Sequence, residues 1–271
     1  MIQFARASLL LALCVALSSG AKAVVFGEDA RLTADQYAQK HHLDAGDVKR
    51  RHAASGVIHC GNARGAGQLT LSNSVITTAA HVLFNERGEP RGDSAHCAFT
   101  ATINGEDVTS AIDTASVITG ATSPYAGPAV HDWAVARLMR PMIGATPYRL
   151  GVSAQSGQDI RFVARGHQDW GAGNVMSMEK CALRNGLASG AEGTREFAFD
   201  CDAGDGASGG AVLNDSSGSL MAVFVGYRST APQAAQPFSM QHYNFAVSID
   251  GAFRRAVQTA ASQASDLSAA R

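Results

Sequence analysis

From Ala53 onward the chain consists of short segments rich in β-branched residues, separated by glycines and other turn-forming residues. In the first half these segments are Gly56–Cys60, Gly65–Leu71, Ser74–Thr78, His96–Ile103, Ala115–Thr119 and Asp132–Leu138. Short apolar runs bounded by turn residues are typical of β-strands. Because no long helical pattern separates them, their spacing predicts an all-β sandwich or barrel rather than alternating strands and helices.

The strand pattern is interrupted once, between Arg140 and Pro147, where two prolines and a glycine are typical of a connection. It resumes with Asp159–Arg165, Arg195–Asp200, Ala211–Leu213 and Leu220–Val225. The sequence therefore predicts two all-β halves, the first over about 53–140 and the second over about 147–249.

The end of the chain has a different pattern. Phe253, Val257 and Ala260 recur at helical spacing after Asp250, which is a suitable N-cap residue. We expect a helix over about 250–263 that packs one face on the second half. Residues 263–271 hold few apolar side chains, so this end is expected to fray.

Residues 1–23 have the pattern of a secretory signal peptide, with Arg6 before the apolar run Leu9–Leu17 and small residues at Ala21–Ala23. The apolar run is shorter than the roughly 20 residues that a transmembrane helix needs. A lipid anchor on Cys14 is disfavoured because the bulky Leu13 precedes it. We expect a soluble protein that begins near Val24, is secreted or periplasmic, and does not contact a membrane after cleavage.

Residues 24–52 are polar and rich in charge, and we interpret them as an N-terminal arm over the surface. Within this arm, His41–His42 is expected to be solvated rather than to bind metal. The basic cluster Lys49–Arg51 is interpreted as a solvated charge run rather than a processing site. The remaining residues, 53–271, form one domain of the two halves and the helix.

Composition excludes one class of partner and indicates a compartment. The chain has 22 basic and 23 acidic residues, and loss of residues 1–23 leaves 20 and 23, a net charge of −3. This balance gives no electrostatic basis for nucleic-acid binding. Four cysteines remain, at positions 60, 97, 181 and 201, and an even number in an exported chain indicates two disulfides with three possible pairings. Zinc is the alternative, but the spacing lacks the usual Cys-x-x-Cys pairs.

The loop Gly206–Gly210 encloses Ser208 between glycines. Glycine adopts backbone dihedrals that a side chain forbids, so successive N–H groups can point to one place beside the hydroxyl, where an oxyanion would be held. Taken alone, the motif fits a polar glycine-rich loop equally well.

A serine nucleophile requires a base within hydrogen-bonding reach and a carboxylate that orients the base. His81 follows an apolar strand and two alanines, and Asp132 opens the apolar run up to Leu138. A buried carboxylate needs a partner such as an imidazole. Each residue also has a structural interpretation, His81 as a satisfied histidine and Asp132 as a turn residue.

Together, the segments Thr78–His81, His131–Ala136 and Gly206–Gly210 resemble, in this order, the three catalytic segments of the chymotrypsin (trypsin-like) serine proteases. The resemblance covers roughly Ala53 to Val257. Within that family the chain is more similar to the bacterial glutamyl-endopeptidase and V8-like branch than to the digestive enzymes.

The resemblance implies an all-β fold of two antiparallel β-barrels with a C-terminal α-helix and a cleft between the barrels. It implies a serine endopeptidase in which Ser208 is the nucleophile, His81 the base and Asp132 the residue that fixes the imidazole. The N–H groups of Gly206 and Ser208 would hold the oxyanion. The substrates would be proteins or peptides, the enzyme a monomer, and neither metal nor cofactor would be needed. A catalytically silent protein that binds a peptide in the cleft is the competing hypothesis.

The resemblance also implies the disulfide pairing, with Cys60–Cys97 around the histidine segment and Cys181–Cys201 before the serine loop. Trp133 is expected in the core and His131 on the opposite strand face from Asp132.

Two departures from the digestive enzymes affect the expected activation and specificity. Ala207 stands where those enzymes carry an aspartate that pairs with a new N-terminal amine, so we expect activity that does not depend on the N-terminal arm. Asp202 lies where trypsin-like enzymes place the acid of the substrate pocket, which would favour lysine or arginine, but a loop-capping role is the alternative. No histidine lies near Val223–Val225, which argues against a preference for glutamate.

Overall fold

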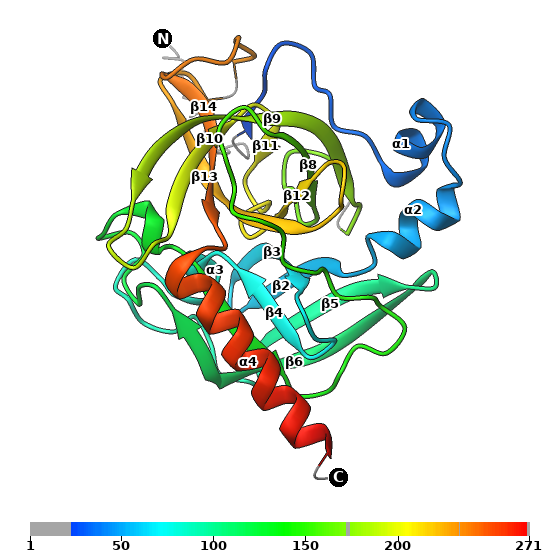
Figure 1. Cartoon of the computed structure of the whole chain (residues 1–271), viewed down its shortest axis with the longest axis vertical. Coiled ribbons are helices and arrows are strands. Elements are labelled where there is room, and N and C mark those ends of the chain that lie inside the picture. Colours follow the sequence, from blue (N-terminus) through cyan, green and yellow to red (C-terminus); the bar gives the residue numbers. More distant parts are fainter. Residues whose placement is uncertain (1–22, 172–173, 233, 270–271) are drawn as a thin grey trace, which may run out of the picture.

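The computed structural model describes residues 23–171, 174–232 and 234–269. Two closed, six-stranded antiparallel barrels lie one above the other, with a long helix beside the lower one (Figure 1). The prediction of two all-β barrels and a C-terminal helix is confirmed. Residues 1–22 of the expected signal peptide lie outside the described residues. In the described part of the chain, no helix is both long and apolar enough to span a bilayer.

The first barrel is closed in the order β2-β3-β4-β7-β6-β5. Its strands are β2 (Ser55–Cys60), β3 (Ala63–Leu69), β4 (Val75–Thr78), β5 (Cys97–Ile103), β6 (Glu106–Thr119) and β7 (Ala134–Leu138). Fully buried Ile58, Leu69, Ile76, Phe99 and Ile112 fill it. β6 is longer than the predicted segment because its first residues are charged and face solvent, which hides the apolar alternation.

The second barrel is closed in the order β10-β14-β13-β12-β8-β9. Its strands are β8 (Asp159–Ala164), β9 (Ser177–Ser189), β10 (Arg195–Phe199), β12 (Ala211–Asn214), β13 (Leu220–Ser229) and β14 (His242–Ser248). Phe162, Phe199 and Phe224 meet in its core, with ring centroids 5.4–5.8 Å apart. The sequence pattern missed β14 because all seven of its residues are buried, including polar His242 and Asn244.

The N-terminal arm is more ordered than the sequence predicted. It contains the N-terminal helices α1 (Ala34–Lys40) and α2 (Ala45–Arg51), and its first residue, Val24, belongs to the short strand β1 (Ala23–Val24). Thr33 and Gln36 form a capping box on α1, and Asp44 caps α2. Although the arm is polar in sequence, Tyr37 is buried against the second barrel, where the Arg161 guanidinium lies 5.5 Å from its ring centroid.

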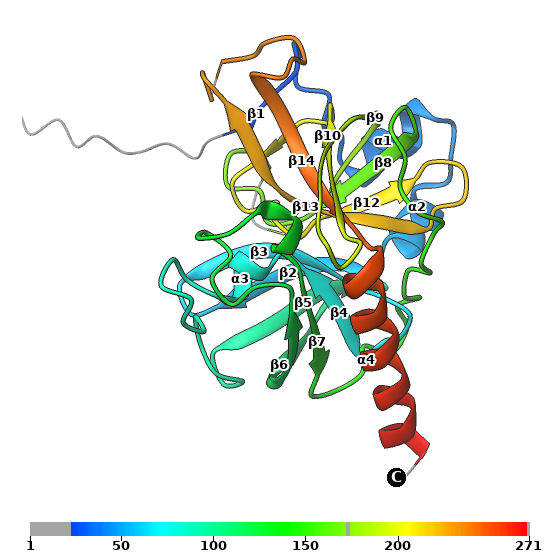
Figure 2. The same cartoon turned by 60° about the vertical axis from the view of Figure 1, so that its left-hand side comes forward.

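The C-terminal helix α4 (Gly251–Ala269) packs on the first barrel, against β4, β6 and β7, and not on the second as predicted (Figure 2). Phe253, Val257 and Ala260 form the predicted buried face, and Phe253 stacks on buried Trp133 at 4.7 Å. The spacing of the apolar residues predicts a buried face but does not specify which barrel that face covers. The helix continues past the predicted end at 263, to Ala269.

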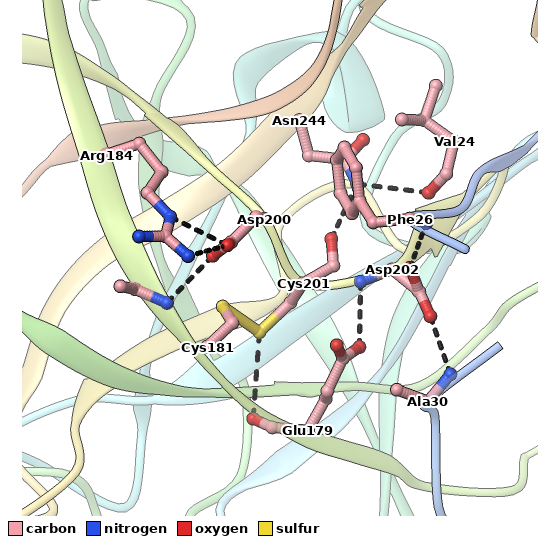
Figure 3. The surroundings of a disulfide bond; sticks show 11 residues. Val24, Phe26, Ala30, Glu179, Cys181, Arg184, Asp200, Cys201, Asp202 and Asn244 are labelled. Carbon is pink, nitrogen blue, oxygen red and sulfur yellow. Dashed lines mark hydrogen bonds and ion pairs between the residues drawn. A yellow bond between two sulfur atoms is a disulfide. The ribbon is translucent and has the colours of Figure 1, made fainter. Parts of the chain in front are cut away.

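Both disulfides have the predicted pairing. Cys60–Cys97 joins β2 to the neighbouring strand β5. Cys181–Cys201 joins β9 to the segment after β10, seven residues before Ser208 (Figure 3). The second disulfide therefore holds the chain that leads into the glycine-rich loop.

Candidate active site

The short helix α3 (Ala80–Leu83) and the 3₁₀ helix η1 (Ala129–His131) bring His81 and Asp132 together. Asp132 Oδ2 lies 2.8 Å from His81 Nδ1, and Asp132 Oδ1 accepts a hydrogen bond from the His81 backbone N–H at 2.9 Å. Since the ionised carboxylate can only accept, the proton of the neutral ring lies on Nδ1 and Nε2 is free to act as a base. Asp132 is only 6% exposed, so water does not compete for this contact.

His131 does not lie on a strand, contrary to the prediction. It ends η1, and its Nδ1 lies 3.7 Å from Glu192 Oε2. The strand β7 begins two residues after Asp132, at Ala134. The turn at Asp132 is therefore set by the helical segment before it.

The loop around Ser208 packs between the two barrels. Gly206 and Gly209 have φ angles of +87° and +90°, which favour glycine. A Cβ on Gly206 would lie 2.0 Å from the Gly166 carbonyl oxygen, and one on Gly209 would lie 2.1 Å from that of Ala66. The Ala66 N–H of the first barrel donates to Ser208 O at 2.7 Å. The glycines thus allow a loop of the second barrel to dock closely on β3 of the first.

Two backbone donors of this loop have no acceptor within the described residues. The N–H of Ala207 donates to Gly204 O and that of Gly209 to Phe224 O, whereas those of Gly206 and Ser208 bond to no protein atom there. These are the two groups that the sequence assigned to an oxyanion. Ala207 is fully buried, so an aspartate at this position would need a charged partner inside the protein.

His81, Asp132 and Ser208 line one cleft of about 380 Å³. Its other walls include Tyr125, Asp205, Val225, Gly226, Tyr227 and Phe245. Ser208 Oγ donates to the carbonyl oxygen of Val225 at 3.4 Å, and no hydrogen bond joins it to the His81 ring in the described structure. Hydrogen bonds between catalytic groups are often long or unformed without substrate.

Asp202 does not line this cleft. Asp202 is 1% exposed, and its carboxylate accepts hydrogen bonds from the N–H groups of Phe26 and Ala30, each at 2.7 Å (Figure 3). The structure therefore gives Asp202 the loop-capping role. The loop that it caps is the start of the arm, residues 24–31, which we call the N-terminal segment.

Glu179, which the sequence did not identify, lies beside Asp202. Its Oε2 accepts a hydrogen bond from the Asp202 N–H at 2.7 Å. Burial and then the nearby Asp202 charge raise the pKa of Glu179 to about 9, and burial also raises the pKa of Asp202. At neutral pH Glu179 is therefore a neutral carboxyl group that tolerates its acidic neighbour.

The N-terminal segment is attached to the chain just before the serine loop. β1 pairs with β11 (Ala203–Gly204), and the side-chain amide of Asn244 donates to both Val24 O and Cys201 O. Figure 3 shows this amide between the two carbonyls. Since β11 ends two residues before Gly206, the expectation that activity is independent of the arm finds no support in the structure.

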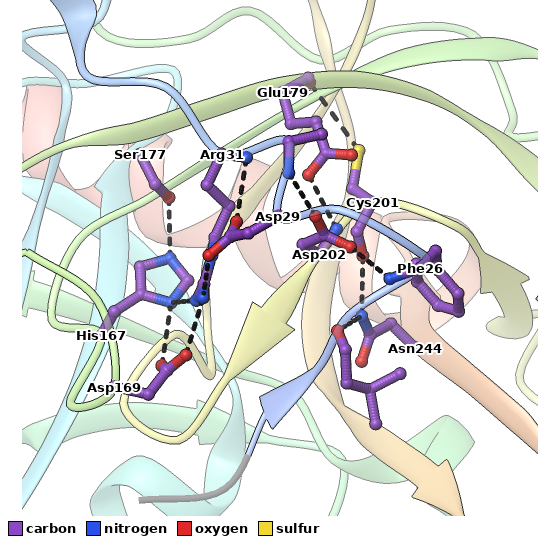
Figure 4. Close-up of polar contacts among 12 residues, drawn as sticks. Phe26, Asp29, Arg31, His167, Asp169, Ser177, Glu179, Cys201, Asp202 and Asn244 are labelled. Carbon is purple, nitrogen blue, oxygen red and sulfur yellow. Dashed lines mark hydrogen bonds and ion pairs between the residues drawn. The ribbon is translucent and has the colours of Figure 1, made fainter. Parts of the chain in front are cut away.

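A second group of contacts holds the end of the same segment. The Arg31 side chain is buried and pairs with Asp29 and with Asp169, at 2.8 and 2.7 Å. Arg31 Nη1 also lies 3.2 Å from Nδ1 of His167 (Figure 4). Burial, followed by the Arg31 charge, lowers the pKa of His167 to about 4, so this histidine is neutral and accepts from Arg31. No group of three or more histidine, cysteine or acidic side chains suited to a metal ion occurs in the part of the chain that the structure describes.

Comparisons with known proteins show the family and the fold. The family model of the trypsin-like peptidase domain matches residues 54–223. The structure of a Glu endopeptidase in complex with MPD is similar over 88% of this chain and 100% of that one, with a TM-score of 0.64 and 16% identity. A thermostable serine protease, AL20, from an extremophilic microorganism is similar over 78% and 98%, with a TM-score of 0.53 and 15% identity. No curated protein sequence matches the chain. The chain belongs to the trypsin-like peptidase family and is a serine-type endopeptidase.

Proposed function

We propose that the protein is an exported serine endopeptidase that works through an acyl-enzyme, with His81, Asp132 and Ser208 as its triad. The observation that carries the proposal is the contact of 2.8 Å between His81 Nδ1 and buried Asp132, in the cleft that Ser208 also lines. Family membership and the fold support the reaction class.

In this mechanism, Ser208 Oγ leaves the Val225 carbonyl and donates to His81 Nε2 when substrate enters. The oxygen attacks the scissile carbonyl carbon while Nε2 takes the proton, and Asp132 stabilises the imidazolium that forms. His81 then gives this proton to the leaving amine, and the acyl-enzyme forms. A water molecule, deprotonated by His81, attacks the ester and regenerates Ser208.

The negative oxygen of the tetrahedral intermediate would be held by the N–H groups of Gly206 and Ser208. Their lack of protein acceptors among the described residues supports this role. Such a donor typically contributes about 3 kcal/mol to transition-state stabilisation. The scheme requires neither metal nor cofactor.

Export is supported by the leader pattern of residues 1–23 and by two disulfides, which form in oxidising compartments. We place the mature start near Val24, the N-terminal arm at 24–52 and the peptidase domain at 53–271. The protein would act as a monomer on protein or peptide substrates in the periplasm or the medium.

Labelling with a fluorophosphonate tests the proposal, because the reagent requires an activated serine. The protein from Val24 onward is expected to be labelled and to cleave a peptide library, while Ser208→Ala is expected to lose both. Ser156→Ala, which changes an exposed serine, serves as the matched control and is expected to keep both. A wild-type protein that shows native circular dichroism but no labelling would favour the peptide-binding hypothesis instead.

A further inference from the structure

A second cavity, of about 770 Å³, is twice as large as the cleft and shares no lining residue with it. It lies among the N-terminal helices, the β5–β6 turn and the chain just before β9. Its walls include Ala34, Lys49, Ala53, Asn104, Arg165 and Met176, and we call it the Arg165 pocket. Helix α2 contributes to this pocket, whereas helix α3 carries His81, and the two helices lie apart in the turned view (Figure 2).

Arg165 follows β8 and is only 7% exposed. Its Nη1 donates to the Asn174 carbonyl oxygen, and its buried Nε has no hydrogen-bond partner among the described residues. It forms no ion pair with any described carboxylate, and the undescribed neighbours Ala172 and Gly173 carry no charge. A guanidinium has five N–H donors, so most of its hydrogen-bonding capacity is unused.

The acidic side chains around the pocket are engaged elsewhere. The Asp107 carboxylate accepts from Thr102 Oγ1 at 2.7 Å and from Asn174 Nδ2 at 3.1 Å, and these hydrogen bonds, followed by the Arg165 charge, lower its pKa. Lys49 pairs with Asp35 at 2.7 Å on the exposed rim. Asp107 is thus the nearby negative charge that Arg165 feels, but no hydrogen bond or ion pair joins Arg165 to a described carboxylate, so a bound anion could pair with it directly.

We propose that the Arg165 pocket binds an organic carboxylate that carries an apolar group. A guanidinium pairs two N–H groups with the two oxygens of a carboxylate, and such charge-assisted pairs are strong when buried. Ala34, Ala53, Val175 and Met176 provide apolar walls next to the cation. The volume falls within the roughly 300–1,000 Å³ range of small-molecule sites.

Two sources supply this chemistry, a free fatty acid and the C-terminus of a peptide that ends in an aliphatic residue. Isothermal titration calorimetry on the Ser208→Ala protein, which does not turn over peptides, compares hexanoate, acetyl-alanyl-leucine and the amide of each. We expect at least one acid to bind and its amide to bind at least tenfold more weakly. The stronger acid identifies the source.

Arg165→Met is expected to abolish binding, and because a methionine fills a buried site without charge, the variant is expected to fold. Arg87→Met removes an exposed arginine as the matched control and is expected to bind normally. Ala34→Leu, which narrows the pocket without removing the charge, is expected to weaken binding and serves if Arg165→Met unfolds. Equal binding of acid and amide, no binding of either acid, or full binding by Arg165→Met would overturn the proposal, as would tighter binding of inorganic phosphate.

Discussion

Replacing Glu179 with glutamine tests whether the buried carboxyl group beside Asp202 is neutral in the folded protein. Glu179 is 7% exposed, and its pKa rises from an ordinary value of 4.5 to about 9. Between these two values the folded protein holds a proton that the unfolded chain releases. The contribution of Glu179 to stability is therefore fully present below pH 4.5 and is lost as pH rises toward 9. Glutamine keeps an oxygen that accepts from the Asp202 N–H but does not titrate.

The expected size follows from this proton count. One proton difference changes the free energy of unfolding by about 1.4 kcal/mol per pH unit, so the wild type should lose about 2.7 kcal/mol relative to Glu179→Gln between pH 6 and pH 8. For a domain of this size, that loss corresponds to roughly 5–10 °C in the melting temperature. Thermal unfolding of both proteins, followed by circular dichroism from pH 5 to 9, measures it.

Buried histidines complicate the wild-type curve but not the comparison. Burial lowers the pKa of His52 to about 3 and that of His167 to about 4. Their contributions are present above the ordinary histidine value of 6.5 and are lost as pH falls, the opposite sign to Glu179. Because both proteins contain these histidines, subtraction at each pH removes their effect. The variant Glu86→Gln makes the same substitution at an exposed position and serves as the matched control. If the stability of Glu179→Gln and that of the wild type changed in parallel with pH, Glu179 would not be a neutral carboxyl group at neutral pH.

Three further changes test other parts of the structure. Asp132→Asn should leave the fold intact and lower kcat about 10⁴-fold on a chromogenic peptide, because the imidazole loses its orientation and tautomer; near-normal kcat would contradict the triad. Asp202→Ala removes the acceptor of the Phe26 and Ala30 N–H groups, at about 0.5–1.5 kcal/mol for each hydrogen bond lost, so aminopeptidase digestion from Val24 should accelerate and peptide hydrolysis should fall; unchanged rates of both would show that the segment is held by other contacts. Phe253→Ala removes the ring stacked on Trp133 and should cost about 3–5 kcal/mol in urea unfolding, whereas a loss below 1 kcal/mol would mean that α4 docks without it.

The three segments around His81, Asp132 and Ser208 could be predicted because their signals are local. An alanine pair before a histidine, an acid before an apolar strand and a serine among glycines are each visible within a few residues. The order of the three segments along the chain indicated the protease family, which no single motif did. The glycines at 206 and 209 also reflect local backbone dihedrals, although the carbonyls that approach them come from distant strands.

The buried polar contacts of the N-terminal segment could not be predicted in this way. Asp202 is 176 residues from Phe26 and 172 from Ala30, and nothing in the neighbouring sequence indicates that its carboxylate caps their N–H groups. The sequence around Glu179 likewise contains no pattern that indicates its burial. A polar residue in a sequence predicts an exposed side chain. Such a residue is buried only where the fold supplies hydrogen-bonding partners for it.

The sequence by itself determined most strands of the two barrels, the halves, the helix face and the candidate chemistry, because alternation, turn residues and spacing act over short distances. The tertiary structure decided which barrel α4 covers, whether Asp202 faces substrate or the N-terminal segment, and where Arg165 is buried without a direct ion pair to a described carboxylate. These outcomes depend on free energies of burial and pairing between segments that are remote in the chain. Such energies are fixed only when both barrels have closed and brought the segments into contact.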